Sequence, residues 1–106
     1  MLLDLLQIKM IEKDFGEILP IRLKNITITS NDIIKFIIYD NNEKIFFNES
    51  FSVVDNILNF QLTKDQSEKL VKGQYNYAIK QYRGDELLCT LQIDNGFYVK
   101  KRVKEE

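Results

Sequence analysis

The sequence predicts an all-β protein that folds as a two-sheet antiparallel sandwich, with one short helical crossover at about residues 63–71. Three observations lead to this prediction. Apolar and polar residues alternate along most of the segments that are rich in apolar residues. Residues that favour turns separate these segments, so a strand is expected roughly every 8–12 residues. No long segment carries the 3.6-residue apolar repeat of an amphipathic helix.

The expected strands follow one another along the whole chain. They lie in LQIKM (6–10), ILPIRLK (18–24), IIKFIIY (33–39), ILNFQL (57–62), YNYAI (75–79), LLCTLQI (87–93) and FYVK (97–100). In each segment alternate side chains point to opposite faces, and one face is apolar enough to be buried. Pro20 has no N–H to donate to a neighbouring strand, which predicts that its strand is an edge strand or is bulged there.

Turns are expected where Gly, Asn and Asp gather between the apolar segments, because these residues tolerate positive φ or hydrogen-bond their own backbone. Asn95-Gly96 is typical of a tight hairpin. Arg83-Gly84-Asp85 predicts a second hairpin, and we interpret this RGD sequence as a turn and not as an integrin-binding motif.

The segment LTKDQSEKLVKG (62–73) has a different pattern, which predicts one or two helical turns between the sheets. Thr63 is a suitable N-cap, and Gln66 stands at the spacing of a capping box. Leu70 is expected to anchor the crossover to the core. Gly73 is expected to follow the helix end in the left-handed conformation.

Two tyrosines follow this crossover. Tyr75 and Tyr77 share the inward parity of Ile79, which predicts that both rings are buried. A tyrosine at the start of a strand, after a glycine and a crossover, is typical of the tyrosine corner of immunoglobulin-like sandwiches, in which the hydroxyl bonds to backbone upstream. A ligand-stacking face would need exposed rings, so we favour a core role for both side chains.

These residues carry a family resemblance. Leu62-Thr63, Asp65, Leu70 and Gly73-x-Tyr75-x-Tyr77, preceded by DIIKFIIYD and followed by RGDELLCTLQIDNGFYV, resemble the immunoglobulin-like N-terminal domain of phage baseplate upper proteins and related tail proteins. The likeness runs from about Leu6 to Val103. It implies one immunoglobulin-like domain over residues 1–106, with residues 1–5 and 104–106 expected to fray. The first turn departs from the family, which often has Gly-Asp where this chain has Lys13-Asp14.

Composition excludes several kinds of chemistry. The sequence contains no histidine and one cysteine, Cys89, so no Ser-His-Asp site, Cys-His site or intrachain disulfide is available within it. The net charge of −1 provides no field that would attract nucleic acid or an anionic membrane. We expect a leaderless chain, because the apolar residues at the start lack the pattern of a signal peptide.

Other candidate sites have a simpler interpretation. Cys89 shares the parity of Leu87 and Leu91, which predicts a small buried apolar residue and not a reactive thiol. The acidic residues of the turns are expected to cap backbone, and a calcium site is the alternative. The spacing of calcium-binding EF-hand loops is absent. We predict no metal and no cofactor.

Two surfaces are candidates for binding. Leu2, Leu3, Leu5 and Ile11 exceed what one face of one strand can bury, which predicts an interface with another chain; fraying of the first five residues is the alternative. Phe46, Tyr82 and Tyr98 have outward or ambiguous parity and are candidate ligand-facing aromatics.

The resemblance and the absence of catalytic residue types together predict a non-enzymatic structural protein of a phage or prophage tail or baseplate. Its expected partners are other virion proteins and further copies of itself, with no nucleic acid and no membrane. Its expected location is the virion, after synthesis in the bacterial host cytoplasm. The alternative function is a carbohydrate- or peptide-binding β-sandwich module.

Overall fold

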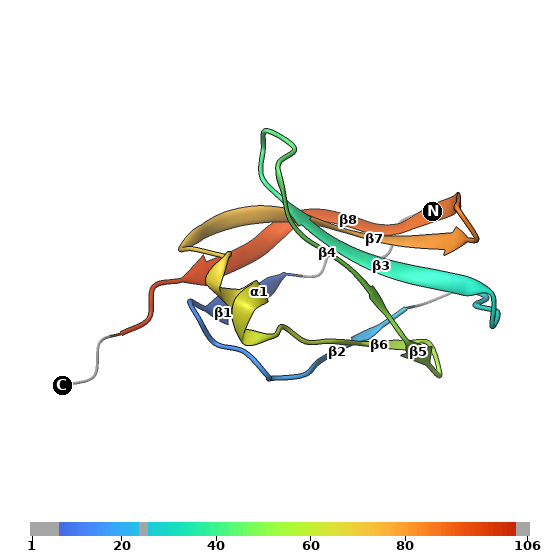
Figure 1. The fold of residues 1–106 in the computed structure, drawn as a ribbon, viewed down its shortest axis with the longest axis horizontal. Coiled ribbons are helices and arrows are strands. Elements are labelled where there is room, and N and C mark those ends of the chain that lie inside the picture. Colours follow the sequence, from blue (N-terminus) through green and yellow to red (C-terminus); the bar gives the residue numbers. More distant parts are fainter. Residues whose placement is uncertain (1–6, 24–25, 104–106) are drawn as a thin grey trace.

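The computed structural model describes residues 7–23 and 26–103, which form a β-sandwich of two sheets (Figure 1). The elements are β1 (Ile8–Ile11), β2 (Leu19–Arg22), β3 (Asp32–Tyr39), β4 (Ile45–Phe51), β5 (Val53–Val54), β6 (Ile57–Phe60), α1 (Lys64–Glu68), β7 (Gly73–Arg83) and β8 (Glu86–Lys100). The larger sheet has the order β1-β8-β7-β3-β4 and the smaller sheet the order β2-β6-β5. The predicted all-β sandwich is therefore confirmed.

One strand pair differs from the predicted antiparallel arrangement. β1 runs parallel to β8, with Ile8 opposite Phe97 and Ile11 opposite Lys100, whereas the other pairs among the described residues are antiparallel. After β1 the chain crosses from the larger sheet to the smaller one, so β1 and β2 are not the two strands of a hairpin. Pro20 lies in β2, an edge strand, as predicted.

The core lies between the sheets and is rich in aromatic rings. Phe36 on β3 is fully buried and stacks on Tyr77 of β7, with ring centroids 5.3 Å apart. The centroid of the Phe36 ring is also 4.4 Å from that of Phe60 on β6, so Phe36 packs against residues of both sheets. Aromatic pairs of this kind contribute free energy to the fold in addition to that gained from burying their surface area.

The tyrosine corner is present. Tyr75 is buried, and its hydroxyl donates a hydrogen bond of 2.8 Å to the backbone carbonyl of Val71. Tyr77 is fully buried two residues further along β7. Both tyrosines therefore belong to the core, as the alternation predicted, and the hydroxyl of Tyr75 ties the start of β7 to the crossover.

The crossover has the predicted capping box. The backbone N–H of Gln66 donates to the hydroxyl of Thr63, and the N–H of Thr63 donates to the side-chain carbonyl of Gln66. Leu70 is buried and anchors the segment, also as predicted. The role expected for Gly73 is wrong, because the helix ends at Glu68 with Lys69 as its C-cap, and Gly73 is already the first residue of β7.

The prediction of a tight hairpin at Asn95-Gly96 is also wrong. Both residues lie inside β8, a single strand of 15 residues, at a register shift between the pairs Tyr77–Asp94 and Tyr75–Phe97. The hairpin at Gly84-Asp85 is confirmed, with Arg83 opposite Glu86 and a positive φ of 62° at Gly84. Because β7 offers partners along its whole length, β8 continues through Asn95-Gly96 with a bulge and does not reverse.

Candidate functional site: a groove between two open strand edges

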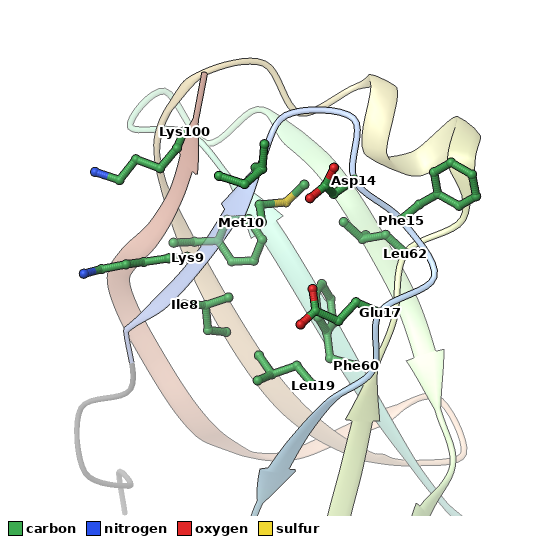
Figure 2. Close-up of a pocket in the computed structure, with 12 residues that line it drawn as sticks. Ile8, Lys9, Met10, Asp14, Phe15, Glu17, Leu19, Phe60, Leu62 and Lys100 are labelled. Atoms are coloured by element: carbon green, nitrogen blue, oxygen red, sulfur yellow. The ribbon is translucent and has the colours of Figure 1, made fainter. Parts of the chain in front are cut away.

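The most distinctive surface feature is a groove where the edges of the two sheets face each other. β1 is the edge of the larger sheet and β2 is the edge of the smaller sheet, and in the described part of the chain neither has a strand on its outer side. The groove has a volume of about 210 Å³. Figure 2 shows its lining, which comes from β1, β2, the end of β6, β8 and the segment 12–18 that joins β1 to β2.

The interior of this groove is apolar. Phe60, Leu62 and Phe97 are core residues that lie in its lining, and Ile8 and Met10 of β1 complete it. The alternation of β1 explains this arrangement, because Ile8 and Met10 have the inward parity while Lys9 is exposed. The groove is thus an opening between the sheets into the edge of the core.

Three large apolar side chains of the lining are also open to solvent. Ile11 is 39% exposed, Phe15 54% and Leu19 37%. Leu19 was expected to share the buried face of its strand with Ile21 and Leu23, and those two are buried. Leu19 lies on the groove at the edge of the smaller sheet, and beyond this edge the described residues place no further strand. These three residues add exposed apolar surface around the groove, and apolar surface gathered around one concavity is a candidate interaction site.

The segment 12–18 that closes one side of the groove is anchored by hydrogen bonds to distant residues. The N–H of Gly16 donates to the carbonyl of Leu62 at 3.0 Å, and the side-chain amide of Gln61 donates to the carbonyl of Gly16 at 2.8 Å. The groove wall is therefore held to the two residues that follow β6 and does not depend on its own turn alone.

The turn after β1 explains how Lys13-Asp14 replaces the expected Gly-Asp. Lys13 has a φ of 66°, the left-handed conformation in which glycine has no steric penalty. Asp14 closes the turn through a hydrogen bond from its N–H to the carbonyl of Ile11 at 3.1 Å. The backbone thus keeps a conformation suited to glycine at the cost of some strain at Lys13.

Acidic groups near the groove are held by the residues that follow the last strand and by the crossover. The carboxylate of Glu12 accepts hydrogen bonds from the backbone N–H of Lys72 at 2.9 Å and of Arg102 at 3.4 Å. The bond from Lys72 is the largest cause that lowers the pKa of Glu12. Asp14 pairs with the guanidinium of Arg102 at 2.5 Å. A second, wider concavity lined by residues 11–14 and 101–103 continues the groove past this ion pair.

The two long sides of the groove differ in charge. Lys9 and Lys100 extend from the side formed by β1 and β8, and Asp14 and Glu17 lie on the side formed by the segment 12–18 (Figure 2). Lys9 and Glu17 form no ion pair with each other or with another described residue. The site therefore combines an apolar floor with a basic rim and an acidic rim.

The described part of the structure includes only one of the four predicted interface residues. Ile11 lines the groove, whereas Leu2, Leu3 and Leu5 lie outside the described residues, as do the ends expected to fray at 1–5 and 104–106. The interface predicted from the sequence did not include Phe15, Glu17, Leu19 or Leu62. The available signal was the pair of apolar residues Phe15 and Ile18 within a charged turn, because alternation does not account for them.

The three candidate ligand-facing aromatics do not form one cluster. Tyr98 lies opposite Gln74 and Tyr82 opposite Leu87, toward the two ends of the β7–β8 ladder. Phe46 is half-buried with its ring edge-on to Tyr75 at 5.3 Å, so it belongs to the rim of the core. Lys35 lies over the ring of Tyr82 at 5.1 Å and Lys100 over the ring of Tyr98 at 5.8 Å.

At the end of the sandwich near the β7–β8 hairpin, a polar cluster has a structural explanation. Asp32 has a fully buried side chain and accepts hydrogen bonds from Arg83, Gln81 and the backbone of Thr29. The bond from Arg83 is the largest cause that holds the pKa of Asp32 far below its ordinary value. Gln81 also bonds the carbonyl of Thr27 at 3.0 Å, so the cluster ties segment 26–31 to β7.

Cys89 belongs to the same cluster. It has the inward parity that was predicted and is half-buried, with its Sγ 3.4 Å from the side-chain carbonyl of Gln81. The prediction that Leu87 shares this face is wrong, because a register shift between Gln81 and Tyr82 turns Leu87 outward, where it is 46% exposed. Asp40 and Asp32 cap backbone as predicted for acidic turn residues: Asp40 accepts from the N–H groups of Asn42 and Lys44, and Asp32 accepts from the N–H of Thr29.

Comparisons with protein families, with characterised proteins and with solved structures found no match. Within residues 7–23 and 26–103, no helix is long and apolar enough to span a membrane. The same residues contain no group of three or more Cys, Asp or Glu side chains placed to hold a metal ion.

Proposed function

We propose that this chain is a non-enzymatic structural protein of a phage or prophage tail or baseplate, and that it works through protein–protein assembly. The likeness to baseplate and tail domains supports the class, and it rests on the residues from Leu62 to Tyr77 together with the strands on either side. The proposal concerns a single sandwich domain that contacts its neighbours through strand edges.

The observation that carries the proposal is the apolar groove between β1 and β2. Ile11, Phe15 and Leu19 expose apolar surface beside it, and Phe60, Leu62 and Phe97 give it a floor continuous with the core. Covering apolar surface contributes roughly 25 cal/mol for each Å² removed from water, so a partner seated here gains binding free energy. A protein surface fits this shape well, because the charged rims would surround an apolar centre.

The test is the composition of the particle. Phage particles are released by induction from a host that carries the gene, purified by density gradient, and searched for this chain by mass spectrometry. We expect the chain in the purified particles. Its presence in the lysate together with its absence from the particles would contradict the proposal.

A groove variant locates the contact. Leu19→Asp places a charge beside the apolar floor and is expected to reduce incorporation into particles about tenfold or more, since burying an unpaired carboxylate is costly. Val54→Asp is the matched control, because Val54 is 67% exposed on β5, at the opposite edge of the smaller sheet. Circular dichroism of both purified variants checks that the fold is kept.

A further inference from the structure

We propose that the β1–β2 groove is the interface of a two-fold symmetric dimer of this chain, held in register by ion pairs between the basic rim of one copy and the acidic rim of the other. This inference rests on the proposed assembly function and identifies the partner at the groove as a second copy.

The arrangement of charges along the groove favours this partner. Lys100 and Asp14 lie at one level of the groove, on its opposite sides, and Lys9 and Glu17 lie at the next level (Figure 2). A two-fold axis parallel to the groove places the basic side of one copy opposite the acidic side of the other copy. Each residue keeps its position along the groove. Such an axis sets Lys9 of one copy against Glu17 of the partner subunit, and Lys100 against Asp14 of the partner subunit.

The side chains at the level of Lys9 and Glu17 are available for ion pairs with a second copy. Lys9 and Glu17 form no ion pair with another described residue, and both side chains belong to exposed residues. Asp14 already binds Arg102, so the level of Lys100 and Asp14 would form a three-group network with two cations. Complementary charges of this kind set the orientation of a complex and contribute less to its affinity.

The apolar residues provide the favourable free energy. Ile11, Phe15 and Leu19 flank the groove and are exposed in the single chain. In a two-fold dimer both subunits contribute these same three residues, so the apolar area that is covered is twice that of one patch. The interface is therefore self-complementary. The dimer thereby covers the part of the core edge that the described strands leave open.

The strand edges themselves argue against an added strand as the occupant. β1 has only four residues, and Pro20 lies in the middle of β2, where it offers no N–H. Short edge strands and edge prolines are features that limit pairing with a further strand. A contact through side chains is therefore favoured over extension of either sheet.

The experiment is a charge exchange followed by sedimentation velocity of the purified chain over a range of concentrations. The unmodified chain is expected to form a dimer. Lys9→Glu and Glu17→Lys should each weaken the dimer about tenfold, because each substitution places two pairs of like charges in the interface. The double variant should restore the dimer, because it exchanges the charges and keeps the complementarity.

The control substitution is Glu49→Lys, which changes the charge of an exposed residue on β4, at the opposite edge of the larger sheet. It should leave the dimer unchanged, and circular dichroism should give the same spectrum for every variant. A chain that stays monomeric at all concentrations, or a double variant no stronger than the single ones, would overturn the dimer. A monomer that still enters particles through Leu19 would overturn this inference alone and leave the proposed function in place.

Discussion

The centre of the sandwich and its β1–β2 side are built from the same kinds of residue but are covered to different degrees. Phe36 at the centre has no exposed surface and contacts rings on four other strands. Leu19 at the side is 37% exposed although its strand alternates just as regularly. The difference shows that alternation decides which way a side chain points, while the neighbouring strands decide whether it is covered.

This comparison also separates stability from binding. Residues packed between both sheets contribute to folding, because their removal leaves a cavity that cannot close. Residues at the open side lose little on truncation in the free chain, and their apolar surface is available to a partner. Of the three predictions that follow, ordered from the largest expected effect to the smallest, the first tests this separation directly.

The largest effect is expected from Phe36→Ala. Removal of this ring should lower the free energy of unfolding by about 3–5 kcal/mol, as is usual for a buried phenylalanine. Leu19→Ala is the matched comparison and should lower it by about 1 kcal/mol or less. Urea unfolding followed by fluorescence measures both values. Equal losses at the two positions would show that the groove is as much a part of the core as the centre.

A smaller effect is expected from the buried carboxylate of Asp32. Hydrogen bonds, first of all from Arg83, lower its pKa in the folded chain, so its charged form stabilises the fold. This contribution is present above the ordinary pKa near 4 and is lost as the pH falls below that value. Asp32→Asn should therefore unfold at a lower urea concentration at pH 7, and its stability should fall less than that of the unmodified chain between about pH 5 and pH 3.

Asp85→Asn provides the control for this measurement, because Asp85 lies in the exposed β7–β8 turn. It should follow the unmodified chain at every pH. If Asp32→Asn had the same pH dependence as the unmodified chain, the charge of Asp32 would not contribute to the stability of the fold.

The smallest effect is expected at the turn beside the groove. Lys13→Gly should raise the free energy of unfolding by up to about 1 kcal/mol, because glycine adopts the positive φ of this position without strain. Lys13→Ala removes the same side chain but keeps the Cβ, so it should give no such gain. Thermal unfolding of the two variants measures the difference, and equal melting temperatures would argue against strain at this turn.

Much of the fold could be predicted because the signals are local. The capping box at Thr63 and Gln66, the hairpin at Gly84-Asp85 and the inward parity of Tyr75 each depend on residues close together in the chain. Asn95-Gly96 shows the limit of such signals. The dipeptide favours a reversal, yet the long pairing of β7 with β8 absorbs it as a bulge.

The candidate site could be predicted only in part. Of the interface residues named from the sequence, Ile11 lies on the groove, and its parity in β1 gave no reason to associate it with Leu19 or Leu62. These residues line the same groove because β1 pairs in parallel with the last strand while β2 pairs with β6. Charge placement has the same origin, since Lys9 on β1 and Glu17 on the segment before β2 lie on opposite sides of the groove.

The sequence by itself determined the two-sheet class, the crossover and the aromatic core, because alternation and capping act over a few residues at a time. Tertiary structure alone decided that β1 and β2 would end as open edges on the same side, with a groove between them. That outcome depends on which strands pair across the whole chain, and pairing free energy is shared among residues far apart in sequence.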